Sequence, residues 1–423
     1  MPTKGKSDPL LWRFSLYGFL KNQQYYEPFF LLVLQAKGLS FFQIGVLFSF
    51  REICVNLMGI PAGFLADFRG RRSSLLVCFS AYIISFTGFA FARSLPWLFG
   101  SMFAFAVGES FRSGTHKAMI FHHLRLEGRE TEKARVYGFT RSWSKLGSAA
   151  SALFSGVLVL FTGGYERTFL YAIPPYLLNM LNVGAYPAAL EGDLKKETKS
   201  VKEILWTILR ETRACLADPR LRPLFLQSAF LQATAKTVIG YLQPLVVASV
   251  VVLAVGGPFS GLDEVRRSSV FLGILYFALN LSSAVASRQS HRLERLERSR
   301  FPFLWMGVLL AGLSIVGGTG FQGAIPGASI LAVTGFVLVV VLGNVWRPLI
   351  IDRLDDASDS RFGAAVLSVE AQCSSLGVML LAPVVGKVAD RFGLVGVGWC
   401  VVGVGMVAGL WGIHANMRRP EAS

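Results

Sequence analysis

Apolar runs of about 20 residues alternate with short polar segments along almost the whole chain. A helix of about 20 apolar residues crosses the hydrocarbon core of a bilayer, because each residue rises 1.5 Å and the core is about 30 Å thick. The pattern predicts twelve membrane-spanning helices, at residues 13–35, 42–66, 73–92, 96–121, 137–161, 166–189, 221–255, 268–287, 301–321, 327–351, 362–386 and 394–415.

The composition agrees with a membrane protein. Of 423 residues, 53% are hydrophobic and only 16% are charged, whereas about 25% of the residues in a soluble domain are charged. A single soluble core stops growing near 250–300 residues, so one large core does not explain this apolar content. We therefore predict an all-α integral membrane protein whose solvent is the lipid bilayer.

The formal charge of +16 has a topological explanation in such a protein. Lys and Arg are concentrated in alternate connections, which predicts cytoplasmic N- and C-termini by the positive-inside rule and gives no reason to expect nucleic acid. Loops are short, and the one N-x-S/T site, Asn280 to Ser282, falls inside a predicted span. These features favour a bacterial cytoplasmic (inner) membrane, and we expect a monomer.

The largest polar segment divides the chain into three parts. We expect an N-terminal six-helix bundle at 1–190, a cytoplasmic central loop at 191–220 and a C-terminal six-helix bundle at 221–423. Within the loop, "VKEILWTILRETRACL" has helical periodicity, so it is either an amphipathic helix on the membrane surface or a plain linker.

A charged motif follows the second predicted span. "GFLADFRGRRSSL", residues 63–75, fits the pattern G-x-L-A-D-x-x-G-R-[RK]-x-x-L. With twelve spans and a basic central loop, the chain resembles the major facilitator superfamily of transporters along its whole length. One departure is Phe68, where relatives often have Arg. The resemblance implies two six-helix bundles around a central cavity and a small-molecule substrate moved by alternating access.

The motif contains residue types that a simple basic anchor would not need. Gly63 and Gly70 allow close helix approach and a tight turn. Asp67 and Arg71 can pair if the segment is helical, and a carboxylate there can cap a neighbouring helix. A second copy, "GKVADRFG", follows span 11, as nested inverted repeats would place it. The candidate gating residues are Gly63, Asp67, Gly70, Arg71, Arg72, Gly386, Asp390, Arg391 and Gly393.

Ionisable residues inside the predicted spans are candidates for the cavity, because such residues are unfavourable in lipid and normally face a partner or water. Lys21, Gln24 and Pro28 fall on one helical face of span 1, with a kink expected at Pro28. Glu109, Arg112 and His116 share a face of span 4. For Arg51, Arg141, Lys145 and Arg347, ion pairs or snorkelling are the preferred interpretation. The candidate substrate and coupling residues are Lys21, Gln24, Glu27, Glu52, Glu109, Arg112, His116, Lys236 and Glu370.

No motif indicates an enzyme. The histidines lack metal-ligand spacing, the five cysteines form no metal or disulfide pattern, and there is no Walker motif. We therefore expect no catalytic residue, cofactor or metal.

The predicted function is secondary active transport of a small solute, with H+ as the expected coupling ion. Glu27 and Glu109 are the first candidates for the proton carrier, ahead of Glu52 and Glu370. A small excess of cations over acids within the spans favours an anionic or zwitterionic metabolite. Export of lipophilic drug-like compounds, lipid flipping, and a non-transporting sensor or scaffold on the same fold are the alternatives. The substrate, the direction of transport, and sodium coupling or facilitated diffusion stay open.

Overall fold

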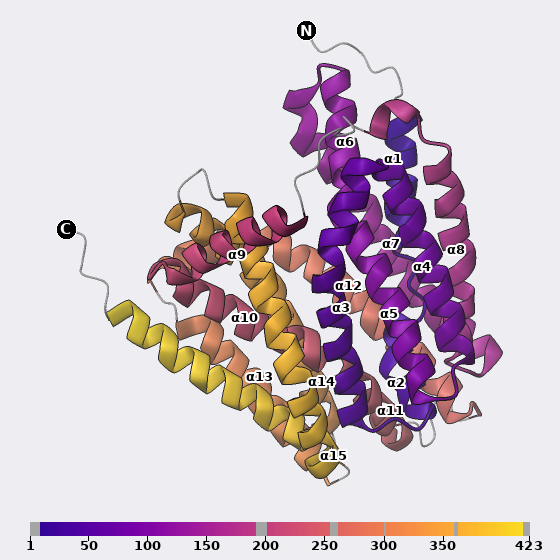
Figure 1. Ribbon diagram of the computed structural model, residues 1–423. Helices are drawn as coiled ribbons and strands as arrows, with labels where there is room; N and C mark the ends of the chain where they lie inside the picture. The colour runs from indigo at the N-terminus through magenta and orange to yellow at the C-terminus, as the bar shows by residue number, and fades with distance from the viewer. Residues whose placement is uncertain are drawn as a thin grey trace. The chain divides into compact units, whose positions relative to one another are not determined.

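The computed structural model describes residues 9–191, 201–253, 261–299, 302–322, 324–325, 327–358 and 363–417. All regular elements in these ranges are helices (Figure 1), so the all-α prediction is confirmed for the described chain. Five helices are long and apolar enough to cross a membrane, at Phe41–Phe68, Arg71–Phe91, Glu130–Thr162, Ala328–Ala357 and Ala365–Leu410.

The helices group into two compact units. Unit 1 contains α3 from Ile53 onward, residues Ser269–Asn280 of α12, and the elements α1 (Pro9–Lys21), η1 (Glu27–Phe29), α4 (Arg71–Phe91), α5 (Leu95–Arg112), α6 (Thr115–Leu126), η2 (Glu130–Glu132), α7 (Lys133–Thr162), α8 (Arg167–Gly184) and η3 (Ala188–Glu191).

Unit 2 combines Phe30–Glu52 from the first part of the chain with most of the chain after Lys199. It contains α3 (Phe41–Phe68) up to Glu52, the remainder of α12 (Glu264–Ser299), and the elements α2 (Phe30–Ala36), α9 (Val201–Ala217), α10 (Leu221–Val238), η4 (Ile239–Tyr241), α11 (Leu242–Leu253), α13 (Pro302–Gly320), α14 (Ala328–Ala357) and α15 (Gly363–Met417). Of the two interpretations left open for the central loop, the structure has a helix, α9, while 192–200 lie outside the described residues.

Aromatic side chains fill the core of unit 1, where α4 packs between α5 and α8. The rings of Tyr82, Phe86 and Tyr176 are fully buried and meet edge to face or tilted, and Tyr26 stacks on Phe169 at a centroid distance of 4.9 Å. Such ring pairs add packing energy beyond the area that they bury.

In unit 2, small residues allow close helix packing. α13 packs against both α14 and α15. A Cβ added at Gly318 would lie 2.3 Å from the backbone nitrogen of Ala332, and one added at Gly312 would lie 2.8 Å from that of Val402. Small residues let backbones approach in a membrane, where the hydrophobic effect drives helix association little.

The first predicted span is not one helix, and this prediction was wrong. α1 ends at Lys21, a turn follows, and η1 and α2 continue after it. Pro28 has no N–H and disfavours helix in the residue before it. The Asn22 amide donates to the carbonyls of Gly18 and Ser144, which stabilises the end of α1. Lys21, Gln24 and Pro28 therefore do not share a face of a continuous helix.

Four further predicted spans are also interrupted or joined. Span 4 breaks between α5 and α6, where Gly114 has φ 73°. Span 7 ends as a helix at Val238 and resumes after η4. Spans 11 and 12 form α15, which changes direction at Gly393 with φ 63°. Backbone with positive φ ends a helix locally, and glycine adopts it without steric strain.

The closest backbone approach in unit 2 joins the first half of α3 to α15. A Cβ added at Gly45 would lie 2.2 Å from the carbonyl oxygen of Ala382. We expect Gly45→Ala to destabilise the protein by about 1–3 kcal/mol, as overpacking does, seen as a lower thermal midpoint in detergent. Gly59→Ala, in the same helix but facing open space among the described residues, is the control. Equal midpoints for both variants would contradict the close contact.

Candidate functional site

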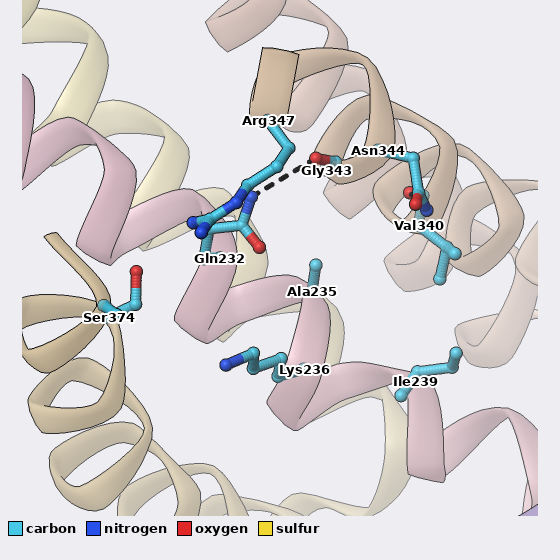
Figure 2. A pocket seen from close by; sticks show the side chains of 10 residues that line it. Gln232, Ala235, Lys236, Ile239, Val340, Gly343, Asn344, Arg347 and Ser374 are labelled. Atoms are coloured by element: carbon cyan, nitrogen blue, oxygen red, sulfur yellow. Dashed lines mark hydrogen bonds between the residues drawn. The ribbon is translucent and has the colours of Figure 1, made fainter. Parts of the chain in front are cut away.

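A cavity lined by both polar and apolar residues lies within unit 2, between α10, α14 and α15. Its volume is about 470 Å³, and Figure 2 shows its lining side chains. The charged lining residues are Lys236 on α10 and Arg347 on α14, and the ten lining residues include no acid. The side-chain amide of Gln232 donates to the carbonyl of Gly343 at 3.4 Å. The side-chain amide of Asn344 donates to Ser283 Oγ at 3.1 Å. The cavity therefore presents two cations and two side-chain amides.

Glu370 on α15 lies behind this cavity and is completely buried. Its Oε1 accepts hydrogen bonds from Arg347, from Ser228 on α10 and from Ser374 on α15. Arg347 therefore forms an ion pair, as expected from the sequence, and also lines the cavity. The serines carried no charge signal, so sequence reasoning missed them. Ser374 follows Glu370 by four residues, a helical spacing that could have indicated their contact.

Glu52 lies farther along the same unit, on α3. Arg51 pairs with its Oε1 at 2.8 Å, and Ser375 Oγ donates to its Oε2 at 2.7 Å. Ser49 Oγ donates to the carbonyl of Met379 at 2.7 Å. Together with Gly45 beside Ala382, these contacts form a continuous line between α3 and α15.

Asp390 ends that line at the N-terminus of α3. Its Oδ1 accepts the N–H of Phe41 at 2.8 Å, and its Oδ2 accepts the N–H of Phe42 at 2.9 Å. Ser40 and Gln43 form a capping box, since each side chain accepts the backbone N–H of the other residue. The capping box leaves the N–H groups of Phe41 and Phe42 without an acceptor, and Asp390 accepts both. Its negative charge also interacts favourably with the positive end of the helix dipole.

The other residues of the second motif copy have different environments. A Cβ at Gly386 would lie 2.3 Å from the Phe41 carbonyl oxygen, so this glycine permits the contact. Arg391 places its guanidinium 5.3 Å from the centroid of the Phe392 ring. Gly393 is the bend in α15. The second copy therefore joins α15 to α3 through the close approach at Gly386 and the carboxylate of Asp390.

The first motif copy contacts its own unit. α3 ends at Phe68 and α4 begins at Arg71, so the helix that would pair Asp67 with Arg71 is interrupted at Gly70, where φ is 92°. Glu191 Oε2 occupies the space of a Gly70 side chain and accepts the N–H of Arg72 at 3.1 Å. The close approach expected at Gly63 is not found among the described residues.

Arg71 and Arg72 also donate from their side chains to backbone carbonyls of unit 1. Arg71 Nη1 donates to Ala118 at 3.3 Å, and Arg72 Nη1 donates to Tyr186 at 3.4 Å. The first copy therefore anchors α4 to α6 and to the chain that follows α8.

A second charged cluster lies in unit 1, where α5 and α6 meet α1. Arg112 pairs with Glu109 Oε1, and Tyr82 donates to Glu109 Oε2 at 2.7 Å. Lys21 lies with its Nζ 5.7 Å from the centroid of the Tyr17 ring. Glu109 and Arg112 come together as the sequence spacing predicted.

His116 belongs to the same aromatic layer, although it follows the break after α5. Its ring stacks on Tyr17 at 3.6 Å, and its Nε2 lies 3.2 Å from Tyr186 Oη. Among the described residues, no group of three His, Cys, Asp or Glu side chains is arranged to hold a metal ion.

The remaining candidates lie at the break in the first span. Gln24 is hydrogen-bonded to Tyr176. Glu27 begins η1, is exposed, and is under the electrostatic influence of Lys145 on α7. Gln243, a polar residue inside the seventh predicted span, accepts the N–H of Leu31 in α2 at 2.9 Å through its Oε1, a partner that the sequence did not indicate.

Long apolar helices with outward hydrophobic side chains define the class of protein. Phe161, Leu181, Leu380 and Leu410 each expose 70% or more of their surface. Apolar side chains exposed in such numbers need an apolar solvent, and with five helices long enough to span a bilayer the chain is an integral membrane protein.

The family is shown by comparison with known proteins. The Major Facilitator Superfamily model matches residues 22–369, so the chain belongs to this family of membrane transporters. No curated protein matches the chain significantly.

Solved structures share the fold at low identity. The nucleoside transporter NupG has a TM-score of 0.76 and 13% identity, covering 97% of this chain and 100% of NupG. A POT family transporter in complex with 5-aminolevulinic acid has a TM-score of 0.69 and 16% identity, covering 99% and 98%. A bacterial homologue of the human lysosomal transporter Spinster, inward-facing and occupied, has a TM-score of 0.71 and 16% identity. The match covers 99% of this chain and 98% of that homologue.

We expect Asp390→Ala to expose the first N–H groups of α3. Loss of a helix cap costs about 0.5–2 kcal/mol, so hydrogen exchange at the start of α3 should become faster in detergent or nanodiscs. Arg391→Ala removes the neighbouring charge and leaves the cap, so it should exchange at the wild-type rate. Unchanged exchange in Asp390→Ala would show that Asp390 does not hold this helix end.

Proposed function

We propose that this protein is a secondary transporter that moves a small solute by alternating access of one cavity. Family membership supports transport, and the observation that carries the proposal is the cavity with two cations in its lining, among the apolar helices of unit 2. Buried charges are unfavourable in a membrane protein unless they bind a partner or a solute, which favours transport over a sensor or scaffold. Twelve spans in two six-helix bundles, at 1–190 and 221–423, are part of this proposal.

The charge of the cavity favours an anionic or zwitterionic metabolite. Lys236 is exposed and Arg347 is partly exposed, so both can bind a solute that enters. The absence of acids among the ten lining residues gives a lipophilic cation no counter-charge there. A guanidinium also binds a carboxylate through two parallel hydrogen bonds.

The contact between α3 and α15 is proposed as the outer gate. The contact is made within unit 2 by four residues, Asp390 and Gly386 on α15 and Gly45 and Glu52 on α3. Because the contact is mainly between backbone and short side chains, separation of the helices would break all its hydrogen bonds nearly together. The first motif copy, with Gly70, Arg71 and Arg72, is proposed to support the inner gate.

The topology that accompanies this proposal follows the positive-inside pattern. Both termini lie in the cytoplasm, and the protein acts as a monomer in a bacterial inner membrane. Proton movement down its gradient supplies the free energy.

Binding tests the proposed substrate class. Purified protein is screened for thermal stabilisation by carboxylates, amino acids, nucleosides and lipophilic cations, and a ligand at 100 times its Kd should stabilise by about 2.7 kcal/mol. We expect stabilisation by a carboxylate that Lys236→Met weakens. Lys117→Met is the control, because Lys117 lies between the rings of Phe121 and Tyr137 in unit 1. Stabilisation by lipophilic cations alone would favour drug export.

Four Gln variants test proton coupling, at Glu27, Glu52, Glu109 and Glu370. In proteoliposomes, replacing the proton carrier should abolish accumulation driven by a pH gradient and leave counterflow, since exchange needs no net proton movement. Counterflow with a hit from the thermal screen and an internal pH-sensitive dye provide both measurements. If all four variants still concentrate solute on a proton gradient, the proton hypothesis is wrong.

A further inference from the structure

The helix of the central loop, α9, carries large apolar side chains that stay exposed. Trp206 exposes 70% of its surface, Leu209 62% and Leu216 42%. In a helix with 3.6 residues per turn, these three positions fall within one third of the circumference. Cys215 lies on the opposite side of the helix from Trp206 and is buried. The exposed apolar side of α9 is therefore distinct from the side that packs on the rest of unit 2.

Cations share the exposed side of α9 with these apolar residues. Arg210 and Arg213 are exposed and lie on either side of Trp206 around the helix. Glu203 is in the first turn, where a carboxylate interacts favourably with the helix dipole, and Glu211 is partly buried on the inward side. The outward face of α9 is defined here as Trp206, Leu209, Arg210, Arg213 and Leu216.

The chain holds α9 close to the start of a membrane span. α9 ends at Ala217, and α10 begins at Leu221, the first residue of the seventh predicted span. Four Cα–Cα steps cover at most about 15 Å. Asp218 makes this connection tight, because its Oδ1 accepts the N–H of Arg220 at 2.7 Å and its carbonyl accepts the N–H of Arg222 at 3.1 Å. Both arginines are exposed, so the basic surface continues from α9 to the start of the span.

The inward side of α9 contacts two helices that line the cavity. α9 packs on α10 and on α15, and Figure 1 shows it at the end of unit 2 opposite to α11. α10 contributes Lys236 to the cavity lining, and α15 contributes Ser374. A partner that holds the outward face of α9 therefore also restrains two of the three helices that line the cavity.

We propose that the outward face of α9 binds the anionic headgroup layer of the bilayer, on the side where the central loop lies. Trp206, Leu209 and Leu216 enter the boundary between headgroups and acyl chains, where amphipathic helices bury their apolar side chains and Trp is enriched. Arg210 and Arg213 donate to lipid phosphates, which a guanidinium binds through two parallel hydrogen bonds. This surface is separate from the transport cavity and needs no solute.

A second copy of the chain fits the outward face less well than a bilayer does. The formal charge of +16 makes two copies repel each other, and the two arginines would need acids opposite them. Contact with water alone leaves a tryptophan and two leucines of one helix face exposed together. The surface of an anionic membrane offers phosphates and an apolar layer within a few ångströms of each other, so it matches both kinds of side chain.

Hydrogen exchange of the full-length protein in nanodiscs tests this binding. Nanodiscs of phosphatidylcholine are compared with nanodiscs in which part of that lipid is replaced by phosphatidylglycerol. We expect the amides of α9 to exchange more slowly with phosphatidylglycerol, and Arg210→Gln/Arg213→Gln to lose this difference. A cation near an anionic surface contributes about a factor of five to binding. With phosphatidylglycerol the double variant should therefore exchange up to about 25-fold faster than wild type.

Lys133→Gln/Arg135→Gln is the matched control, because it removes two cations at the start of α7 and leaves α9 intact. It should keep the lipid dependence of the wild type. Trp206 emission, taken as the difference between wild type and Trp206→Phe, should be quenched by lipid brominated near the headgroup end of its acyl chains. Monodisperse elution verifies that each variant is folded.

Three results would overturn the inference. The first is equal exchange of the wild-type α9 amides in both lipids. The second is slower exchange without quenching of Trp206, which would indicate a second copy of the chain on this face. The third is an equal loss of lipid dependence in the control, which would show a response to total charge and no binding by α9 itself.

Discussion

A charge placed among apolar helices must have a partner, and this constraint organises the polar residues of both units. Three acids inside the helices meet it with an arginine each, but with different geometry. Glu109 and Glu52 pair within their own helices, so the pairs move with the helix and persist when it shifts. Glu370 pairs with Arg347 on another helix. That pair depends on the distance between α14 and α15, and its arginine lines the cavity of unit 2. The same requirement for neutralisation therefore produces two pairs within single helices and one pair between two helices.

Small residues determine where helices come close enough for backbone groups to take part. Along α3, Gly45 lies against Ala382 and Ser49 bonds to the Met379 carbonyl. Gly386 in turn lies against Phe41. Side chains longer than these would separate the backbones and remove the hydrogen bonds at Asp390. The close packing and the polar contacts thus lie along the same pair of helices.

Much of the fold class could be predicted from sequence because it follows from composition and period. An all-helical membrane protein follows from repeated apolar runs, and the family follows from a motif whose glycines and acid have fixed spacing. Breaks inside the runs could not be placed, because hydropathy does not register a turn at residues 22–26 or at Gly114. A hydropathy window averages over such a turn, whereas proline, positive φ and side-chain amides decide it locally.

The candidate site was predicted only in part, for a related physical reason. Charged residues stand out against apolar neighbours, so Glu370, Lys236 and Arg347 were all noticed. Their grouping was not, because Arg347 and Glu370 are 23 positions apart on different helices. Ser228 and Gln243 resemble ordinary polar residues of a helix until their acceptors or donors are known. Sequence thus identifies the ionic residues, and tertiary packing selects their partners.

Asp390 contacts the main chain of α3, not its side chains, and this has a genetic consequence. Every residue type except proline supplies the same N–H at positions 41 and 42, so these positions can drift without loss of the cap. Suppressors of an Asp390 defect would therefore not arise by changing the side chain of Phe41 or Phe42. They would have to supply a new acceptor from a neighbouring position on α15. Of the two sides of this contact, only the carboxylate side is therefore determined by the identity of a side chain.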